Sequence, residues 1–262
     1  MVDFFRILHS ELLKLWYMKA TRIVVLLATI LQNGLAYISG KQILAIGLDA
    51  TPETCSELIS PLPPLEYMGF DVVSFATIPL IVLGSIYGAA EYKRHSLRTT
   101  LLATCQKIRV FASKLILTAT FSFLLSFLSI FMTITVTHAT FGAQGLKLFT
   151  FNPMVWKFIM TGTIGLMLLT VLSFVIGFLL RTSIVPMLFL IPQVYNLGTV
   201  LAEHFYICKF LPVPLVNSLI ASSENIFSRH PATNITLLSI WILLISMIAF
   251  IRFFISDLGG KY

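Results

Sequence analysis

Residues 158–180 read FIMTGTIGLMLLTVLSFVIGFLL and contain no Asp, Glu, Lys or Arg. A helix needs about 20 consecutive apolar residues to cross the hydrocarbon core of a bilayer, and this stretch is long enough. The rest of the chain has the same character, because 57% of all residues are hydrophobic and only 11% are charged. Soluble domains carry about 25% charged residues. The sequence therefore predicts an all-α polytopic membrane protein.

Six apolar runs predict six transmembrane helices in a single domain that covers residues 1–262. The middle four runs contain no charged side chain. Pro186 and Pro192 should bend the fifth helix, because proline cannot donate the helical hydrogen bond. The expected spans are residues 23–48, 72–90, 115–138, 158–180, 182–202 and 235–255.

The distribution of basic residues predicts how these spans are oriented, because cytoplasmic loops of membrane proteins are enriched in Lys and Arg. If the N-terminus lies inside, most of the 18 Lys and Arg residues fall on the inner side, and the outer loop 49–71 holds acids but no basic residue. The outer side then keeps only Lys41, Lys147, Lys157, Lys209 and Arg229. We therefore expect both termini in the cytoplasm. The net charge of +7 should meet anionic lipid head groups rather than nucleic acid.

The segment 4–22 precedes the first span and is predicted to be an interfacial amphipathic helix. At about 100° per residue, its apolar side chains share one face, while Arg6, Ser10, Glu11 and Lys14 share the other, with Ile7 as an exception. Such a helix lies in the membrane interface with its apolar face toward the acyl chains. A flanking helix continuous with the first span is the alternative. The residues assigned to the apolar face are Phe4, Phe5, Leu8, Leu12, Leu15 and Trp16.

Residues 203–234 are expected to form an outer segment that is re-entrant or lies on the surface, because irregular backbone at membrane depth must be covered by protein or water. Pro212 and Pro214 should break the backbone, and residues 215–227 then read as a short helix. Cys55 and Cys208 fall on this outer side. They could form a disulfide, although two separate thiols are the favoured interpretation.

No enzyme motif is present in the sequence. GxSxG and HExxH are absent, the 5 His residues are scattered over loops and span ends, and no pair of carboxylates lies within a span. The stretch from Gly34 to Gln42 approaches a phosphate-binding loop, but it has one residue too many and ends in Gln rather than Ser or Thr. No acid is available within the membrane for ion coupling. The chain is therefore expected to hold no cofactor or metal, and either to form a passive pore or to draw energy from a partner.

Residues 91–114 read EYKRHSLRTTLLATCQKIRVFASK and are the most charged part of the chain. Ser96 is a good N-cap, and apolar leucines form a short stripe between the basic residues. The stretch has an acid with an aromatic residue, then Ser-Leu-Arg, a Leu-Leu step, basic residues and a closing Lys. The residues that carry this pattern are Glu91, Ser96, Leu97, Arg98, Leu101, Leu102, Lys107, Arg109 and Lys114.

This pattern resembles the permease subunits of type-2 ABC exporters, of the small six-span kind that includes transporters for peptide antibiotics and for lantibiotic immunity. In that family the loop between the second and third spans is a cytoplasmic coupling helix, which docks into a cleft on the ATPase subunit. The resemblance therefore implies a docking surface made of Glu91, Ser96, Leu97, Arg98, Leu101, Leu102, Lys107 and Arg109. The N-terminal interfacial helix and the broken connection before the last span also match the family. Where the family often has Pro-x-Arg, this chain has Cys105-Gln106-Lys107. No proline therefore sets the boundary between the coupling helix and the third span.

The resemblance implies a permease that moves a hydrophobic or amphipathic cargo outward across the bacterial cytoplasmic membrane. Two permease chains, identical or related, would work with two ATPase subunits, and ATP and Mg²⁺ would bind to those partners. The chain itself would do no covalent chemistry. Two alternative functions are a stand-alone pore or secondary carrier without an ATPase, and an intramembrane enzyme, which would need a paired nucleophile and base inside a span. For residues 91–114 alone, the alternative is an ordinary basic loop that binds no partner.

Overall fold

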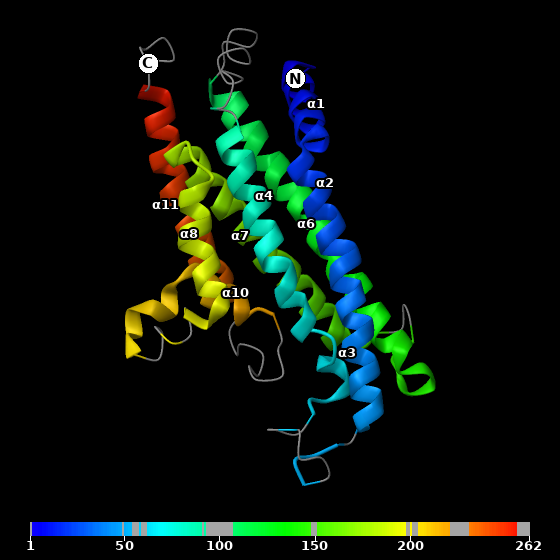
Figure 1. Cartoon of the computed structure of the whole chain (residues 1–262). Helices are drawn as coiled ribbons and strands as arrows, with labels where there is room; N and C mark the ends of the chain where they lie inside the picture. Colours follow the sequence, from blue (N-terminus) through cyan, green and yellow to red (C-terminus); the bar gives the residue numbers. More distant parts are fainter. Residues whose placement is uncertain are drawn as a thin grey trace.

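The computed structural model is a bundle of helices (Figure 1). It describes residues 2–48, 50–53, 58, 62–90, 92, 107–147, 151–197, 200, 204–220 and 231–255. Within these residues there is no β-strand, as the all-α prediction requires. The helices are α1 (Val2–Tyr17), α2 (Lys19–Leu26), α3 (Gln32–Ile46), α4 (Thr77–Ala90), α6 (Lys107–Thr140), α7 (Pro153–Leu180), α8 (Ile184–Pro192), α10 (Pro212–Asn217) and α11 (Pro231–Ile255).

Five helical segments in the described ranges are long and apolar enough to cross a membrane. They correspond to five of the six expected spans, and their bounds are Lys19–Ile46, Leu65–Ala90, Lys107–Thr140, Pro153–Leu180 and Pro231–Ile255. The remaining one, expected at residues 182–202, is a shorter apolar helix at Ile184–Tyr195. Pro192 has no N–H to donate there, and the helix widens into a π-helical turn at Gln193–Leu197. Six spans are therefore not confirmed.

The N-terminal helix ends before the first span begins. Met18 lies between α1 and α2 with an extended backbone, at φ −65° and ψ 128°. The first helix therefore does not run without a break into the first span, and α1 instead packs along α6. Its position in the membrane interface stays a prediction.

The third span begins earlier than the sequence predicts. Helix α6 starts at Lys107, so residues 107–114 form its first two turns, and the structure differs from the predicted loop 91–114 at the C-terminal end. No proline interrupts this stretch, and Val110 and Phe111 are buried against neighbouring helices. The helix therefore continues through it. Residues 91–106, which connect α4 to α6, are called the 91–106 segment below.

Helix α7 lies at the centre of the bundle, where α4, α6 and α11 all pack against it. Glycine allows α4 to approach α7 with the two backbones in contact, since a Cβ atom at Gly88 would overlap the carbonyl oxygen of Phe174. The hydroxyl groups of Ser85 and Ser173 lie 2.7 Å apart in the same interface. Helices α4 and α7 therefore form a closely fitted pair.

The first span contains a π-helical turn at its middle. This turn, Leu27–Leu31, joins α2 to α3. The hydroxyl oxygen of Ser129 on α6 lies 2.6 Å from the backbone oxygen of Ala28 and 2.5 Å from Oε1 of Gln32. Polar contacts between helices are a usual means of association in lipid. This contact therefore sets the register of the first span against α6.

The connection between α8 and α11 contains a short helix that starts on prolines. Helix α10 begins at Pro212, in the first turn of a helix, where the missing N–H has no bond to make. The sequence predicts that Pro212 and Pro214 break the backbone before a helix at residue 215, whereas the prolines themselves start the helix. Leu215 is buried in this turn. Helix α10 ends at Asn217, so the predicted helix 215–227 does not continue through residues 218–220, and residues 221–230 lie outside the described residues.

Candidate functional site at the base of the 91–106 segment

The 91–106 segment holds most residues of the predicted docking surface. Two residues of that surface are described, Lys107 and Arg109, and both lie in the first turn of α6, where Arg109 is exposed. The others lie outside the described residues, so their positions stay predictions: Glu91, Ser96, Leu97, Arg98, Leu101 and Leu102. Cys55 also lies outside them, and its pairing with the half-buried Cys208 stays a prediction as well.

Aromatic rings gather where the 91–106 segment leaves the bundle, and we call them the aromatic cluster. The ring of Phe178 on α7 lies at its centre, with centroid distances of 5.3 Å to Tyr92, to Phe111 of α6 and to Phe253 of α11. Phe250 of α11 completes the cluster at 5.8 Å from Phe111. Such ring pairs contribute about 0.5–1.5 kcal/mol each beyond the area they bury. The ends of α6, α7 and α11 thus share one packed contact with Tyr92, which follows α4.

Basic side chains next to the aromatic cluster donate hydrogen bonds to backbone oxygens near the C-terminal ends of two helices. Arg252 of α11 donates from Nη1 to the backbone oxygen of Leu179, 2.8 Å away, near the C-terminus of α7. Lys107 donates to the backbone oxygen of Phe254, 3.0 Å away, near the C-terminus of α11. Cations at these positions oppose the negative end of the helix dipole. Lys107, which the sequence assigns to ATPase docking, is therefore bonded to its own chain.

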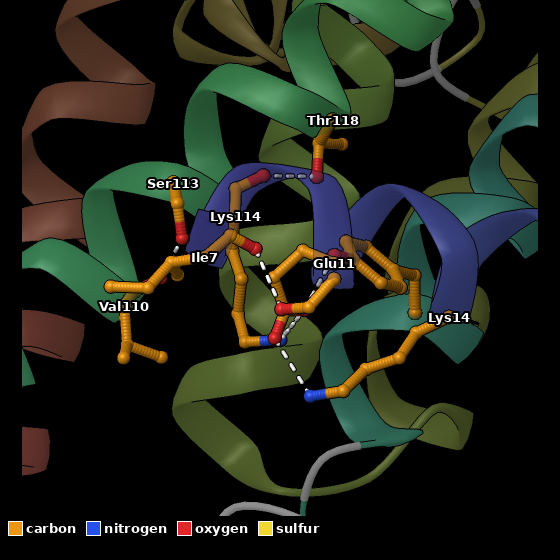
Figure 2. Close-up of polar contacts among 9 residues, drawn as sticks. Ile7, Glu11, Lys14, Val110, Ser113, Lys114 and Thr118 are labelled. Carbon is orange, nitrogen blue, oxygen red and sulfur yellow. Dashed lines mark hydrogen bonds and ion pairs between the residues drawn. The ribbon is translucent and has the colours of Figure 1, made fainter. Parts of the chain in front are cut away.

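A buried ion pair lies in the same packed core as the aromatic cluster. Figure 2 shows the ammonium groups of Lys14 and Lys114 converging on the carboxylate of Glu11. Lys14 is 38% exposed and its Nζ lies 2.7 Å from Oε1, whereas Lys114 donates to Oε2 and is, like Glu11, 0% exposed. The hydroxyl of Tyr87 on α4 donates to the same Oε2 at 3.2 Å. One buried carboxylate thus joins α1, α4 and α6.

The surroundings of Glu11 keep its carboxylate ionised. Burial by itself raises the pKa of this group, but the positive charge of Lys114 and the hydrogen bonds from Lys114 and Lys14 outweigh burial. The pKa of Glu11 therefore lies below its ordinary value. An unpaired charge in such a buried place is costly. Pairing with Lys114 is what allows the acidic side chain of α1 to pack against α6.

The sequence predicts Glu11 on the polar face of the N-terminal helix, and the structure corrects this. Ile7, Glu11 and Leu15, spaced four residues apart, form a buried face of α1. Ile7 is an apolar residue on the face predicted to be polar, and it was the sequence signal that this face is buried. The predicted apolar face is divided: Leu15 is buried, Phe4 and Leu8 are half-buried, and Phe5, Leu12 and Trp16 are exposed.

Basic residues concentrate at this end of the bundle, where both α1 and the C-terminal part of α11 lie (Figure 1). Among the described residues they are Arg6, Lys14, Lys19, Arg22, Lys107, Arg109, Lys114, Arg181 and Arg252. The opposite end carries Lys41, Lys147, Lys157 and Lys209, together with the acids Glu53, Glu66 and Asp71. This asymmetry is the pattern on which the predicted orientation rests.

A cavity of about 410 Å³ lies at the opposite end of the bundle from the buried ion pair. Its lining is mostly apolar, with Thr51 and Gln144 as polar members and no acid or base. No group of three or more His, Cys, Asp or Glu side chains that could hold a metal ion occurs in the described ranges. The base of the 91–106 segment, which holds the buried ion pair and the aromatic cluster, is the candidate functional site.

Comparison with known proteins gives no family for this chain. No protein-family model matches it, and neither a curated protein nor a solved structure matches it. What the chain does must therefore be inferred from its own residues and geometry.

Proposed function

We propose that this chain is the membrane-spanning permease subunit of an ATP-driven ABC exporter, with ATP and Mg²⁺ bound by separate ATPase subunits. The observation that supports the proposal is the shared packing of several helices at the base of the 91–106 segment. There the aromatic cluster joins the ends of α6, α7 and α11 to Tyr92, which follows α4, and Glu11 adds α1 through its contact with Tyr87 of α4. A force applied to this segment would therefore reach most of the bundle.

Close packing would make such a force transmissible. Protein interiors have low compressibility, so a displacement imposed at one place is passed to its neighbours. Helix α4 is fixed to the central helix α7 where Gly88 meets Phe174, and α6 meets α7 where Phe111 contacts Phe178. Both ends of the 91–106 segment are thus attached to helices that pack on α7. A lever driven by an ATPase requires such attachments.

The composition of the helices favours an external source of energy. Helices α2, α3, α4, α6, α7, α8 and α11 contain no Asp or Glu, and Glu66 and Asp71 lie at the start of the segment Leu65–Ala90, before α4 begins. Acids within membrane helices are expensive and are kept where they relay protons or bind ions. The buried acid Glu11 lies on α1, outside the segments that are long enough to span a membrane. Energy from a partner ATPase fits this composition better than coupling to an ion gradient.

The other parts of the proposal rest on the resemblance of residues 91–114 to type-2 exporter permeases. Two permease chains, identical or related, would form the transport path in the bacterial cytoplasmic membrane, with both termini in the cytoplasm. The cargo would be hydrophobic or amphipathic, such as a peptide antibiotic. Phe5, Leu12 and Trp16, which α1 leaves exposed, would then lie among lipids at the membrane interface.

The test is recovery of an ATPase together with the chain. A tagged chain is purified in mild detergent from membranes of its source organism. ATPases with a P-loop that co-purify are identified by mass spectrometry and assayed for ATP hydrolysis. We expect Leu101→Asp combined with Leu102→Asp to remove the ATPase, because burying unpaired charges in an apolar cleft is costly. Insertion of this variant into the membrane should be unchanged.

The matched control places the same charges at the other end of the bundle. Met154→Asp with Phe205→Asp changes two exposed apolar side chains there and should retain the ATPase. If the variant of Leu101 and Leu102 keeps its ATPase, the docking role is wrong. If the unmodified chain purifies without an ATPase and vesicles that contain it release cargo without ATP, the function is that of a stand-alone pore or carrier.

A further inference from the structure

One oxygen of Glu11 contacts both helices that flank the 91–106 segment. Tyr87 lies on the last turn of α4, just before the segment, and its hydroxyl donates to Oε2 at 3.2 Å. Lys114 lies two turns into α6, after the segment, and its ammonium donates to the same oxygen. Lys14, on α1 itself, binds the other oxygen, Oε1, at 2.7 Å. Glu11 therefore bridges the two ends of the segment.

This bridge differs in kind from the apolar packing around it. Apolar contacts between helices depend little on direction, whereas a buried ion pair is favourable only while its two charges stay paired. Glu11 and Lys114 are both 0% exposed, and separating them would leave charges buried without a partner. The ammonium of Lys114 also lies 5.3 Å from the centre of the Tyr87 ring, which adds a cation–π contact. The side chains of Glu11, Lys114 and Tyr87 thus form one compact unit. Any relative movement of α1, α4 and α6 either carries this unit along as a whole or breaks its contacts.

We propose that Glu11 is a positioning residue for the predicted docking surface: its carboxylate staples α4 to α6 across the base of the 91–106 segment and makes α1 move with that segment. The proposal rests on the proposed function only where it names residues 91–106 as a docking surface. The staple itself is a property of this chain alone. It can therefore be measured without any partner protein.

The experiment measures the separation of the two flanking helices directly. Spin labels are attached at Ala90→Cys and Arg109→Cys, one on each side of the segment, in a chain whose 3 native cysteines are replaced by Ser. The labelled chain is placed in lipid nanodiscs, and pulsed electron paramagnetic resonance gives the distribution of distances between the labels. We expect Lys114→Met to broaden this distribution and shift it to longer distances. Tyr87→Phe should broaden it less, because only the contact from α4 is lost.

Lys14→Met is the matched control, because it removes the other lysine from the same carboxylate and leaves both flanking helices in contact with Glu11. The distribution of distances should then equal that of the unmodified chain. Glu11→Leu combined with Lys114→Met removes the staple without leaving a buried charge, so this double variant should fold. Its unfolding temperature should return toward that of the unmodified chain, while its distribution stays broad. If the ion pair only stabilised the fold, the double variant would recover both the unfolding temperature and the narrow distribution of distances of the unmodified chain.

Two results would overturn the staple: a distribution in Lys114→Met that equals the one in Lys14→Met, or a double variant whose distribution is as narrow as in the unmodified chain. Retention of the co-purified ATPase is measured on the same substitutions in a chain without the labelled cysteines, so that Arg109 is kept, and we expect it to fall in Lys114→Met and not in Lys14→Met. Widened distances with full retention of the ATPase would leave the staple standing and would refute its role in positioning the docking surface. The docking role itself is tested by the variant of Leu101 and Leu102. The two proposals therefore fail in distinguishable ways.

Discussion

Replacing Gly88 with Ala should destabilise the bundle, because there is no space for the added methyl group. The new Cβ would overlap the carbonyl oxygen of Phe174 and lie 2.9 Å from the backbone nitrogen of Phe178. Both neighbours are backbone atoms of α7 and cannot rotate away, so the cost belongs at the top of the overpacking range, about 3 kcal/mol. Ala restores about 1 kcal/mol of helix propensity relative to Gly. The net expected loss of stability is about 2 kcal/mol.

Gly34→Ala is the matched control, since a Cβ at Gly34 on α3 meets nothing within 4 Å. This variant should gain about 1 kcal/mol from helix propensity alone. Thermal unfolding in detergent can be followed by the fluorescence of the 3 Trp residues. In a chain of this size each kcal/mol moves the midpoint by about 2–4 °C, so Gly88→Ala should lower it by about 4–8 °C. If both variants move the midpoint in the same direction, α4 and α7 do not pack with their backbones in contact.

Lys114→Met should lower the free energy of unfolding by about 3 kcal/mol or more, because it leaves Glu11 buried without its main partner. Lys14→Met should cost less than about 1 kcal/mol, because Lys14 is partly exposed; equal shifts in the unfolding midpoint would contradict this difference. Since the pKa of Glu11 is lowered by folding, its stabilisation is complete above its unfolded-state pKa of about 4.3 and is lost as pH falls through the lower folded-state pKa. The unfolding midpoint of Glu11→Gln should therefore depend less on pH than that of the unmodified chain below about pH 4.3, and identical pH profiles would count against this. In a chain whose 3 native cysteines are replaced by Ser, a membrane-impermeant thiol reagent applied to intact cells should label Lys147→Cys but not Arg109→Cys, and the reverse pattern would invert the predicted orientation.

The spans could be found from the sequence because length and lack of charge are local properties. Residues 158–180 were predicted as a span, and α7 contains all of them. Hydropathy marks the apolar part of a helix and not its full length, which is why α7 begins earlier, at Pro153, and α6 begins at Lys107. Residues 182–202 are predicted as a span bent by Pro186 and Pro192, and that span is not confirmed, because the described helix at Ile184–Tyr195 is shorter. Their composition is apolar throughout, but the backbone widens after Pro192.

The candidate site could be predicted only in part, because its contacts join distant parts of the chain. Glu11 and Lys114 are separated by 103 positions, and no periodicity within α1 shows that a lysine on another helix will meet the acid. The aromatic cluster has the same origin, since Phe111 and Phe253 meet only after α6 and α11 have packed on α7. Helical periodicity does indicate that Ile7 interrupts the polar face of α1. It does not indicate which residue pairs with Glu11.

The π-helical turn at Leu27–Leu31 makes the first span sensitive to the number of its residues. A π-helical turn already holds one residue more than an α-helical turn, because its hydrogen bonds join residues five apart rather than four. Insertion of a further residue there would rotate all of α3 relative to α2 by about 100°. Gln32, which is buried and lies against Ser129, would then move toward the surrounding lipid. The insertion would place a polar amide against hydrocarbon, although no side chain outside the turn had changed its chemistry. We therefore expect this span to tolerate exchanges of residue type better than insertions.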